Sequence, residues 1–168
     1  MPCSTAPISP SDFRQALGHF ASGLTVITSS LEQTSVGFTC QSFYSVSMAP
    51  PLVSFSVMAG SASYPLIREA GRFAVNILSA EQAPIANQFA RRGADKWQGV
   101  AAQRSPLGNP LIAGSLHWLD CHIVAEHLAG DHLIVIGEVN ALGQPVESGE
   151  PLLYFKGEYG QFDAAQLS

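Results

Sequence analysis

Short runs in which apolar and polar residues alternate dominate this chain, and they predict a fold made mainly of β-strands. The clearest run places Val53, Phe55 and Val57 on one face and Ser54 and Ser56 on the other, as a half-buried strand does. Runs of the same kind predict strands at residues 24–29, 36–42, 52–57, 73–78, 115–127, 132–142 and 152–155.

Two of these runs predict a hairpin. Residues 115–127 and 132–142 are long for strands, and they are joined through Ala129-Gly130-Asp131, a segment suited to a tight turn. Because strands joined by short turns dominate the chain, and because no repeat, linker or low-complexity tract divides it, the pattern favours an antiparallel barrel over a parallel α/β sheet.

Helix signals occur between the strands. Ser11 and Asp12 begin an amphipathic pattern that continues to about Ala21, and we expect this helix to plug one end of the sheet. Pro65 suits the first turn of a short helix that ends before Gly71. A capping-box pattern at residues 79–82 predicts a further helix through Ile85 and Phe89.

The composition favours one domain that associates with a second copy of itself. A chain of 168 residues can bury a full core without a metal or a disulfide. Hydrophobic residues make up 46% of the chain and charged residues only 12%, so we expect a partner to cover extra apolar surface and predict a homodimer. The expected single domain covers residues 1–168, with its core at residues 11–162 and a loose tail after Phe162.

Charge, hydropathy and cysteine content argue against several classes of protein. With a formal net charge of −5 and only eight lysines and arginines, the chain has no basic stripe for nucleic acid. No apolar run approaches the ~20 residues of a membrane-spanning helix. Cys3, Cys40 and Cys121 are odd in number and far apart, so we expect no disulfide framework and a reducing cytoplasm. Cys121 alternates with apolar neighbours and is expected in the core.

Residues 37–57 carry the most distinctive chemistry. Small hydroxyl residues crowd between two strand-like runs, and Pro50-Pro51 closes the gap. Ser42, Ser45 and Ser47 lie near main-chain donors that a turn leaves unpaired, which predicts a cradle for a planar, oxygen-rich ligand, with the hydroxyl face of Ser54 and Ser56 as its floor. The alternative is a serine-rich loop that satisfies its own backbone.

Four further groups are candidates for ligand contact, each with a structural alternative. Cys40 either packs or touches a ligand. In Gly130-Asp131-His132 the imidazole either faces a bound ring or belongs to a plain hairpin turn. Ser61-Ala62-Ser63 forms a phosphate seat or an ordinary helix cap. The basic cluster is either a phosphate contact or a solvated surface, and it consists of Arg91, Arg92 and Lys96.

Familiar catalytic and metal-binding motifs are missing from the sequence. It has no glycine-rich dinucleotide loop, no Walker loop and no serine nucleophile elbow. The histidines at 117, 122, 127 and 132 recur every five residues, a spacing that gathers them on one face of neither a strand nor a helix. We therefore expect no metal site, and we expect His117, His122 and His127 at strand ends or on the surface.

Taken together, these elements resemble the flavin reductase family, whose members supply reduced flavin to two-component monooxygenases. The resemblance runs from about Phe13 to Tyr159, and the segment at residues 38–43 is similar to the reductase of the actinobacterial steroid-ring hydroxylase. The sequence departs from the commoner family pattern at Cys40-Gln41, where Ala-Asn is frequent, and at Trp97, where Phe is frequent. The matching residues are Phe13-Arg14, 20–28, 37–39, 45–47, Pro50-Pro51, 73–78, Gln82, Phe89-Ala90, Asp95-Lys96-Trp97, Cys121, 130–132, 137–139 and 151–155.

The resemblance implies a mainly β fold with flanking helices, an antiparallel Greek-key split β-barrel of the FMN-binding type. It implies a homodimer that binds FMN or FAD near the subunit interface, takes its hydride from NADH or NADPH, and serves a flavin-dependent monooxygenase component. His132 and Tyr159 would line the nicotinamide side, with His132 as the catalytic residue. The remaining implied contacts to the flavin and its nucleotide are Thr39, Cys40, Gln41, Ser42, Ser45, Val46, Ser47, Ser61, Ala62, Ser63, Phe89, Asp95 and Lys96.

This assignment explains why no acid–base pair is evident. Hydride passes from nicotinamide C4 to flavin N5, so the protein needs only to align the rings and to supply donors for the growing negative charge. Two other functions are possible on the same barrel: a non-catalytic flavin- or haem-binding module, and an oxidase of the pyridoxamine phosphate type. The scarcity of basic residues speaks against the oxidase.

Overall fold

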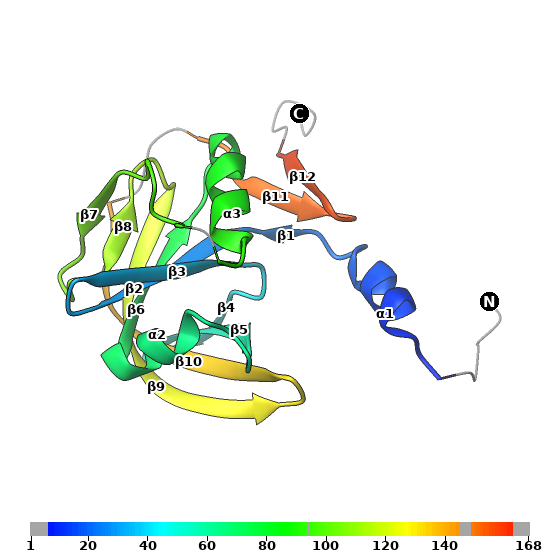
Figure 1. Cartoon of the computed structure of the whole chain (residues 1–168), viewed down its shortest axis with the longest axis horizontal. Helices are drawn as coiled ribbons and strands as arrows, with labels where there is room; N and C mark the ends of the chain where they lie inside the picture. Colours follow the sequence, from blue (N-terminus) through cyan, green and yellow to red (C-terminus); the bar gives the residue numbers. More distant parts are fainter. Residues whose placement is uncertain (1–6, 94, 145–148, 163–168) are drawn as a thin grey trace.

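The computed structural model describes residues 7–93, 95–144 and 149–162, and its main body is a seven-stranded antiparallel sheet in the order β3-β2-β6-β9-β10-β5-β4. The sheet curls into a barrel with the helices outside it (Figure 1). The predicted mainly β, antiparallel class is confirmed. The strands are β2 (Thr25–Leu31), β3 (Thr34–Cys40), β4 (Tyr44–Met48), β5 (Pro51–Met58), β6 (Arg72–Ile77), β9 (His117–Ala129) and β10 (His132–Leu142).

The barrel is split between β3 and β5. Neither strand pairs with the other in the hydrogen-bonded order of the sheet. Instead, the hydroxyl of Ser42, just past β3, donates to the carbonyl of Ser56 at 3.1 Å and accepts from its amide at 2.9 Å. One side chain thus joins the two strands at a single point, and the rest of the gap is free to form a cavity.

Smaller elements surround this sheet. A second sheet contains β1 (Ser22–Gly23), β11 (Leu152–Phe155) and β12 (Glu158–Gln161), and a separate hairpin contains β7 (Ala102–Arg104) and β8 (Pro110–Ile112). The helices are α1 (Pro10–Leu17), α2 (Tyr64–Ala70), the 3-10 turn η1 (Ala80–Gln82) and α3 (Ala83–Ala90). No helix among the described residues is long and apolar enough to cross a membrane.

Several local predictions are confirmed. In β5, Val53, Phe55 and Val57 are buried, as their alternation predicted, but Ser54 on the other face is fully buried too and does not line the cavity, so only Ser56 of the expected hydroxyl floor reaches it. The β9–β10 hairpin pairs Ala129 with His132, leaving two residues in its turn. The capping box at residues 79–82 is present and begins η1, which α3 continues. Helix α2 ends at Gly71, whose φ of 67° suits glycine.

The prediction for the first helix was wrong in part. Its N-cap is Ser9, whose hydroxyl accepts from the Asp12 amide at 3.1 Å, and the helix ends at Leu17 rather than near Ala21. None of its residues is buried, and it projects away from the barrel instead of plugging the sheet (Figure 1). The spacing of Phe13 and Leu17 reveals an apolar face but not what covers it.

Strands β4 and β12 were not predicted from the sequence. Both are short, and each pairs with only one neighbour. Strand β4 does alternate apolar and hydroxyl residues, but its hydroxyl residues were assigned to a ligand cradle and its apolar face is exposed. The predicted loose tail after Phe162 and Cys3 lie outside the described residues.

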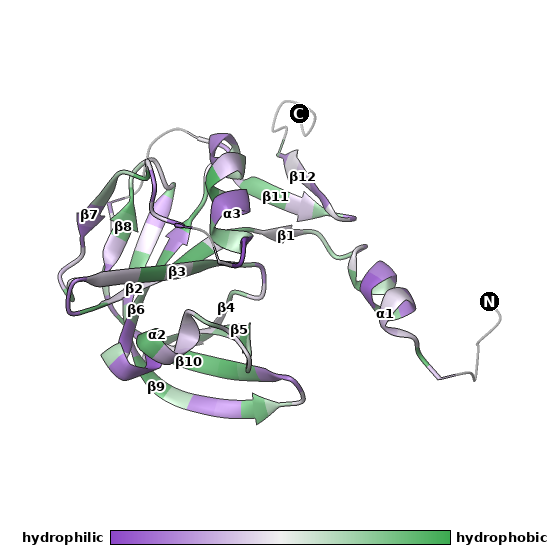
Figure 2. Cartoon of the chain, viewed as in Figure 1, coloured by the Kyte–Doolittle hydropathy of each residue, from purple (hydrophilic) through white to green (hydrophobic). Residues whose placement is uncertain are grey.

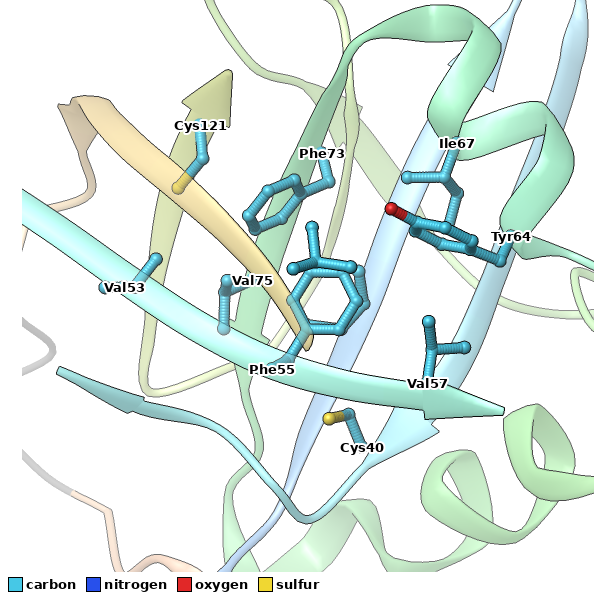
Figure 3. Close-up of a cluster of buried hydrophobic side chains, with 11 residues drawn as sticks. Cys40, Val53, Phe55, Val57, Tyr64, Ile67, Phe73, Val75 and Cys121 are labelled. Atoms are coloured by element: carbon cyan, nitrogen blue, oxygen red, sulfur yellow. The ribbon is translucent and has the colours of Figure 1, made fainter. Parts of the chain in front are cut away.

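Aromatic packing between α2 and the sheet forms the larger of two apolar clusters. The ring of Phe55 meets those of Phe38, Tyr64 and Phe73 edge to face, with centroids 5.8, 6.3 and 5.0 Å away. Figure 3 shows Phe55 in the middle of the cluster, with Tyr64 projecting into it from α2. Cys121 is fully buried in the same cluster, as predicted.

The second cluster holds α3 against the barrel. Phe89 of α3 is fully buried with Val26, Leu78 and Leu152. Both α3 and β9 carry hydrophilic and hydrophobic residues along their length (Figure 2). Because α3 is anchored by its apolar face, the loop that follows it begins at a fixed place beside β3.

A buried polar cluster fastens the β7–β8 hairpin to the strands behind it. Asn109 is fully buried and donates to Asp120 Oδ1 at 2.7 Å, and Asp120 Oδ2 accepts from the Leu107 amide at 2.8 Å. The hydroxyl of Ser29 donates to Asn109 Oδ1 at 3.3 Å. These partners satisfy a carboxylate that would be costly to bury alone.

Candidate functional site

A cavity of about 850 Å³ occupies the split between β3 and β5. One wall is residues 35–42, on and after β3, and the opposite wall lies within residues 56–63, between β5 and α2. The third wall is formed by residues 89–93 and 95–97, which follow α3, and His132 completes the lining from the start of β10. The cavity is therefore built by segments far apart in the sequence.

The three walls meet at the carbonyl oxygen of Gly37. It accepts hydrogen bonds from Ser63 Oγ at 3.2 Å and from Lys96 Nζ at 3.1 Å. A Cβ at this position would lie 2.8 Å from a Phe89 ring carbon and 2.9 Å from the Ile27 carbonyl oxygen. Only glycine allows so close an approach, which is why β3 can carry a carbonyl to the junction of the walls.

Hydroxyl groups of the turn before α2 face the cavity with hydrogen-bonding capacity to spare. Ser61 Oγ accepts from the Tyr64 amide at 3.3 Å and keeps its own proton, whereas Ser63 Oγ donates to Gly37 and keeps its lone pairs. Ala62 lies between them in the lining. The N-cap residue of α2 is Ser63, and the Ser61 hydroxyl satisfies the first amide of the helix while it faces the cavity.

Positive charge lies on the wall after α3. Lys96 is half-buried, and this burial lowers the pKa of its ammonium group. One of its three donors is used by Gly37, which leaves two for a ligand. Asp95 Oδ1 accepts from the Trp97 amide at 3.1 Å and shapes the turn that carries Lys96. Arg91 and Arg92 are exposed at the rim.

The floor beside β3 is less polar. Burial raises the pKa of the Cys40 thiol, so its sulfur stays protonated and packs as an apolar group. The Thr39 hydroxyl donates to the Ala86 carbonyl at 2.5 Å, which ties β3 to α3. Phe89 stacks edge to face on Trp97 with centroids 4.9 Å apart. Gln41 is exposed, with its side chain at the cavity.

His132 occupies the first position of β10, opposite Met58 on β5. Its Nδ1 lies 2.7 Å from Asp131 Oδ1, and the hydrogen bond and charge of the imidazole lower the pKa of that carboxyl. A histidine with Nδ1 held by a carboxylate has Nε2 left for other partners. The residue thus belongs to the hairpin turn and lines the cavity at once.

Four predicted contacts do not line the cavity of a single chain. Ser45, Val46 and Ser47 lie on β4, beyond the Ser42 bridge. Tyr159 lies on β12, and its hydroxyl donates to Asn87 Oδ1 at 2.9 Å. The predicted residues that the structure brings together are Thr39, Cys40, Gln41, Ser42, Ser61, Ala62, Ser63, Phe89, Asp95, Lys96 and His132.

Some lining residues were missed by the sequence analysis. Gly37 and Phe38 were treated as strand residues, and Met58 was not considered. The signal that could have found Gly37 is a glycine inside a strand pattern, which often marks a close backbone approach. Among the described residues no group of histidine, cysteine and carboxylate side chains is arranged to hold a metal.

Comparison with known proteins identifies the family to which this architecture belongs. Residues 17–163 match the family model described as "Flavin reductase like domain", and the chain therefore belongs to the flavin reductase-like family. The resemblance drawn from the sequence is thus confirmed.

Individual relatives agree with this family. The reductase subunit HsaB of a flavin-dependent monooxygenase from Mycobacterium tuberculosis is 41% identical over 92% of this chain and 83% of its own. Among solved structures, nitrilotriacetate monooxygenase component B from Mycobacterium thermoresistibile matches with a TM-score of 0.90 and 41% identity, over 93% of this chain and 88% of its own. The NADH:FAD oxidoreductase SgcE6 of Streptomyces globisporus, solved with NAD and FAD fragments, matches with a TM-score of 0.87 and 32% identity, over 95% of this chain and 98% of its own.

Proposed function

We propose that this protein is an NAD(P)H-dependent flavin reductase that reduces FMN or FAD and supplies the reduced flavin to a partner monooxygenase. The observation that carries the proposal is the cavity in the barrel split, where spare hydroxyl groups, a half-buried lysine and a histidine surround a space large enough for a flavin. Relatives named as an NADH:FAD oxidoreductase and as the reductase subunit of a flavin-dependent monooxygenase support it.

The donor set of the cavity fits a flavin nucleotide. Phosphate oxygens prefer hydroxyl and ammonium donors, and the Ser61 hydroxyl and the Lys96 ammonium both have donors to spare. The uncharged wall at Thr39, Cys40 and Gln41 suits an uncharged heteroaromatic ring. For Ser45, Val46 and Ser47 to contact the ring as well, it must extend past Ser42 along β4.

Hydride transfer between the two rings requires little chemistry from the side chains of the protein. Bound flavin supplies an N5 atom that accepts hydride from the nicotinamide C4 atom. Lys96 offsets negative charge in the site, and half-burial strengthens that interaction. His132 presents its free ring nitrogen on the nicotinamide side, while Asp131 holds the other. The walls align the two rings and exclude water.

Replacing His132 with alanine should weaken NAD(P)H use more than flavin binding. The imidazole stands at the edge of the cavity, whereas the flavin has the other walls to hold it. We expect kcat/KM for NADH to fall about tenfold, the effect of losing one hydrogen bond, with the flavin Kd nearly unchanged. Stopped-flow hydride transfer and flavin titration measure the two quantities. Equal losses in both would contradict the role given to His132.

A homodimer is part of the proposal. Helix α1 has eight residues and none buried, and a helix so short is not stable without packing. Its Phe13 and Leu17 are each 56% exposed. Edge strand β4 also exposes alternate apolar residues, Tyr44, Val46 and Met48, and such an edge is normally covered. A second copy of the chain is the partner that these surfaces favour.

The double substitution Phe13→Asp with Leu17→Asp should convert the dimer to a monomer. Two carboxylates in an apolar interface carry a desolvation cost that the contacts cannot offset. Light scattering after size exclusion measures the mass, and Gln15→Asp on the same helix is the control that should remain dimeric. A wild-type protein that is monomeric at micromolar concentration would contradict the proposed homodimer.

The wider setting follows from the reaction. A dihydronicotinamide donor is supplied inside the cell, so we place the protein in the cytoplasm. The family match over residues 17–163 supports treating the chain as one flavin reductase-like domain.

Mixing the purified protein with NADH or NADPH and added FMN or FAD tests the function. Loss of nicotinamide absorbance that requires flavin, and no organic substrate, is the expected result. Flavin binding without NAD(P)H oxidation would support a non-catalytic binding module instead. Turnover only with pyridoxamine phosphate would support the oxidase.

A further inference from the structure

A cluster of three side chains outside the cavity braces α2 against the β9–β10 hairpin. Both oxygens of the Glu126 carboxylate are held by the Arg68 guanidinium, Oε1 by Nε at 3.0 Å and Oε2 by Nη2 at 2.8 Å. The Tyr64 hydroxyl donates to the same Oε1. The Arg68 guanidinium also lies over the Tyr64 ring, 5.2 Å from its centroid. We call Tyr64, Arg68 and Glu126 the α2 brace.

The brace holds its groups in defined protonation states. Burial raises the pKa of Glu126, but hydrogen bonds from Arg68 and Tyr64 and the charge of Arg68 outweigh it and lower that pKa. Burial and the hydrogen bond to Glu126 raise the pKa of the Tyr64 phenol. At neutral pH the carboxylate is therefore charged and the phenol is a donor, which is the pairing that makes the strongest hydrogen bonds.

The brace joins two parts of the cavity wall, the turn before α2 and the start of β10, although none of its own three residues lines the cavity. Tyr64 directly follows Ser63, and its amide donates to Ser61 Oγ at 3.3 Å. Glu126 lies on β9 opposite Val135, in the same half of the hairpin as His132. A second link, from the Ala59 amide to the Asp131 carbonyl at 2.9 Å, ties the same two parts together on the cavity side.

We infer that the α2 brace is a positioning device, which fixes the distance across the cavity between the Ser61–Ser63 turn and His132. The inference rests on the proposed function, because those two groups are the ones proposed to hold flavin phosphate and to face nicotinamide. The start of the turn is held against the hairpin by the β5–β10 ladder, which pairs Met58 with His132, and by the Ala59–Asp131 backbone bond. The brace holds the other end of the turn, where α2 begins, so that the turn is fixed to the hairpin at both ends.

The substitution Glu126→Ala tests this inference. It removes the acceptor of both Tyr64 and Arg68 but changes no residue of the cavity lining. We expect flavin affinity and kcat/KM for NADH each to fall about tenfold, the effect of one misplaced hydrogen bond at each end of the cavity. Arg68→Lys keeps the positive charge but loses the two-pronged guanidinium contact to the carboxylate. Its flavin affinity and kcat/KM should lie between those of Arg68→Met and those of the wild type.

A control separates positioning from loss of stability. Asn109→Ala breaks the polar cluster behind the β7–β8 hairpin and leaves the cavity lining intact. Both variants are compared at a temperature where each is fully folded by circular dichroism. Asn109→Ala should change flavin affinity less than twofold. A tenfold loss in this variant too would show that the effect of Glu126→Ala is general destabilisation and would overturn the inference.

A double-mutant cycle gives the sharper result. If Glu126 acts by placing the turn, Ser61→Ala should cost flavin affinity in the wild type but much less in Glu126→Ala. If the two substitutions change the free energy of flavin binding independently, so that their effects simply add in the double variant, the inference is wrong. Wild-type protein that binds no flavin would refute the proposed function itself, whereas flavin binding that Glu126→Ala leaves unchanged would refute only the brace.

Discussion

The variant Lys96→Met should bind FMN and FAD ten to a hundred times more weakly than the wild type, while its affinity for riboflavin changes little. Lys96 is the cation set deepest in the cavity wall, with one donor held by Gly37 and two left for a ligand. A charge-assisted hydrogen bond contributes about 1.5–3 kcal/mol, which corresponds to this range of affinity. Riboflavin lacks the phosphate and so lacks the partner of that charge.

Fluorescence titration with the three flavins measures the effect, since Trp97 lies in the same wall. Lys96→Gln separates the charge from the hydrogen bond, because the amide can still donate to Gly37. Lys156→Met is the matched control, since Lys156 is exposed in a turn outside the cavity lining. An equal loss of riboflavin affinity in Lys96→Met would place the lysine at the ring and not at the phosphate.

The variant Phe55→Ala should lower the free energy of unfolding by about 3–5 kcal/mol, the usual cost of truncating a buried aromatic residue. Phe55 is fully buried and contacts three aromatic rings from β3, α2 and β6, of which Tyr64 of α2 and Phe73 of β6 are seen in Figure 3. Its truncation leaves a cavity where the sheet and α2 meet. A loss of this size approaches the whole stability of a marginal domain, about 5–15 kcal/mol.

Urea unfolding at constant temperature measures this loss as a shift in midpoint with an unchanged slope. Phe55→Leu keeps most of the side-chain volume, so its free energy of unfolding should fall clearly less than that of Phe55→Ala. Because Phe55 and the cavity residue Ser56 are neighbours on opposite faces of β5, flavin should partly restore the stability of Phe55→Ala. A loss below 1 kcal/mol in Phe55→Ala would contradict the central place of this ring in the core.

The sequence predicted those parts of the fold in which one segment carries its own signal. Pro65 and Gly71 bound α2 because each residue has a fixed backbone preference. The alternation at Val53, Phe55 and Val57 marked β5 because one face of that strand is buried. Helix α1 shows the limit of such signals: its apolar face was evident, but none of the described residues buries it.

The cavity could be predicted only in outline. The hydroxyl residues of Ser61–Ser63 and the basic residue Lys96 were evident as candidates, yet their meeting at Gly37 depends on the curl of the sheet. Ser42 was expected to contact a ligand, and in the structure its hydroxyl already has the Ser56 carbonyl, the Ser56 amide and Cys40 Sγ as partners. A contact between strands distant in sequence leaves no local pattern, so it cannot be seen before the fold is known.

The most direct test of the account is a crystal structure of the protein with FMN or FAD and NAD⁺. We expect the flavin in the split between β3 and β5, its phosphate at Ser61 and Lys96, and the nicotinamide ring on the His132 side. Flavin bound at any other place on the protein, or with its phosphate away from Lys96, would contradict it.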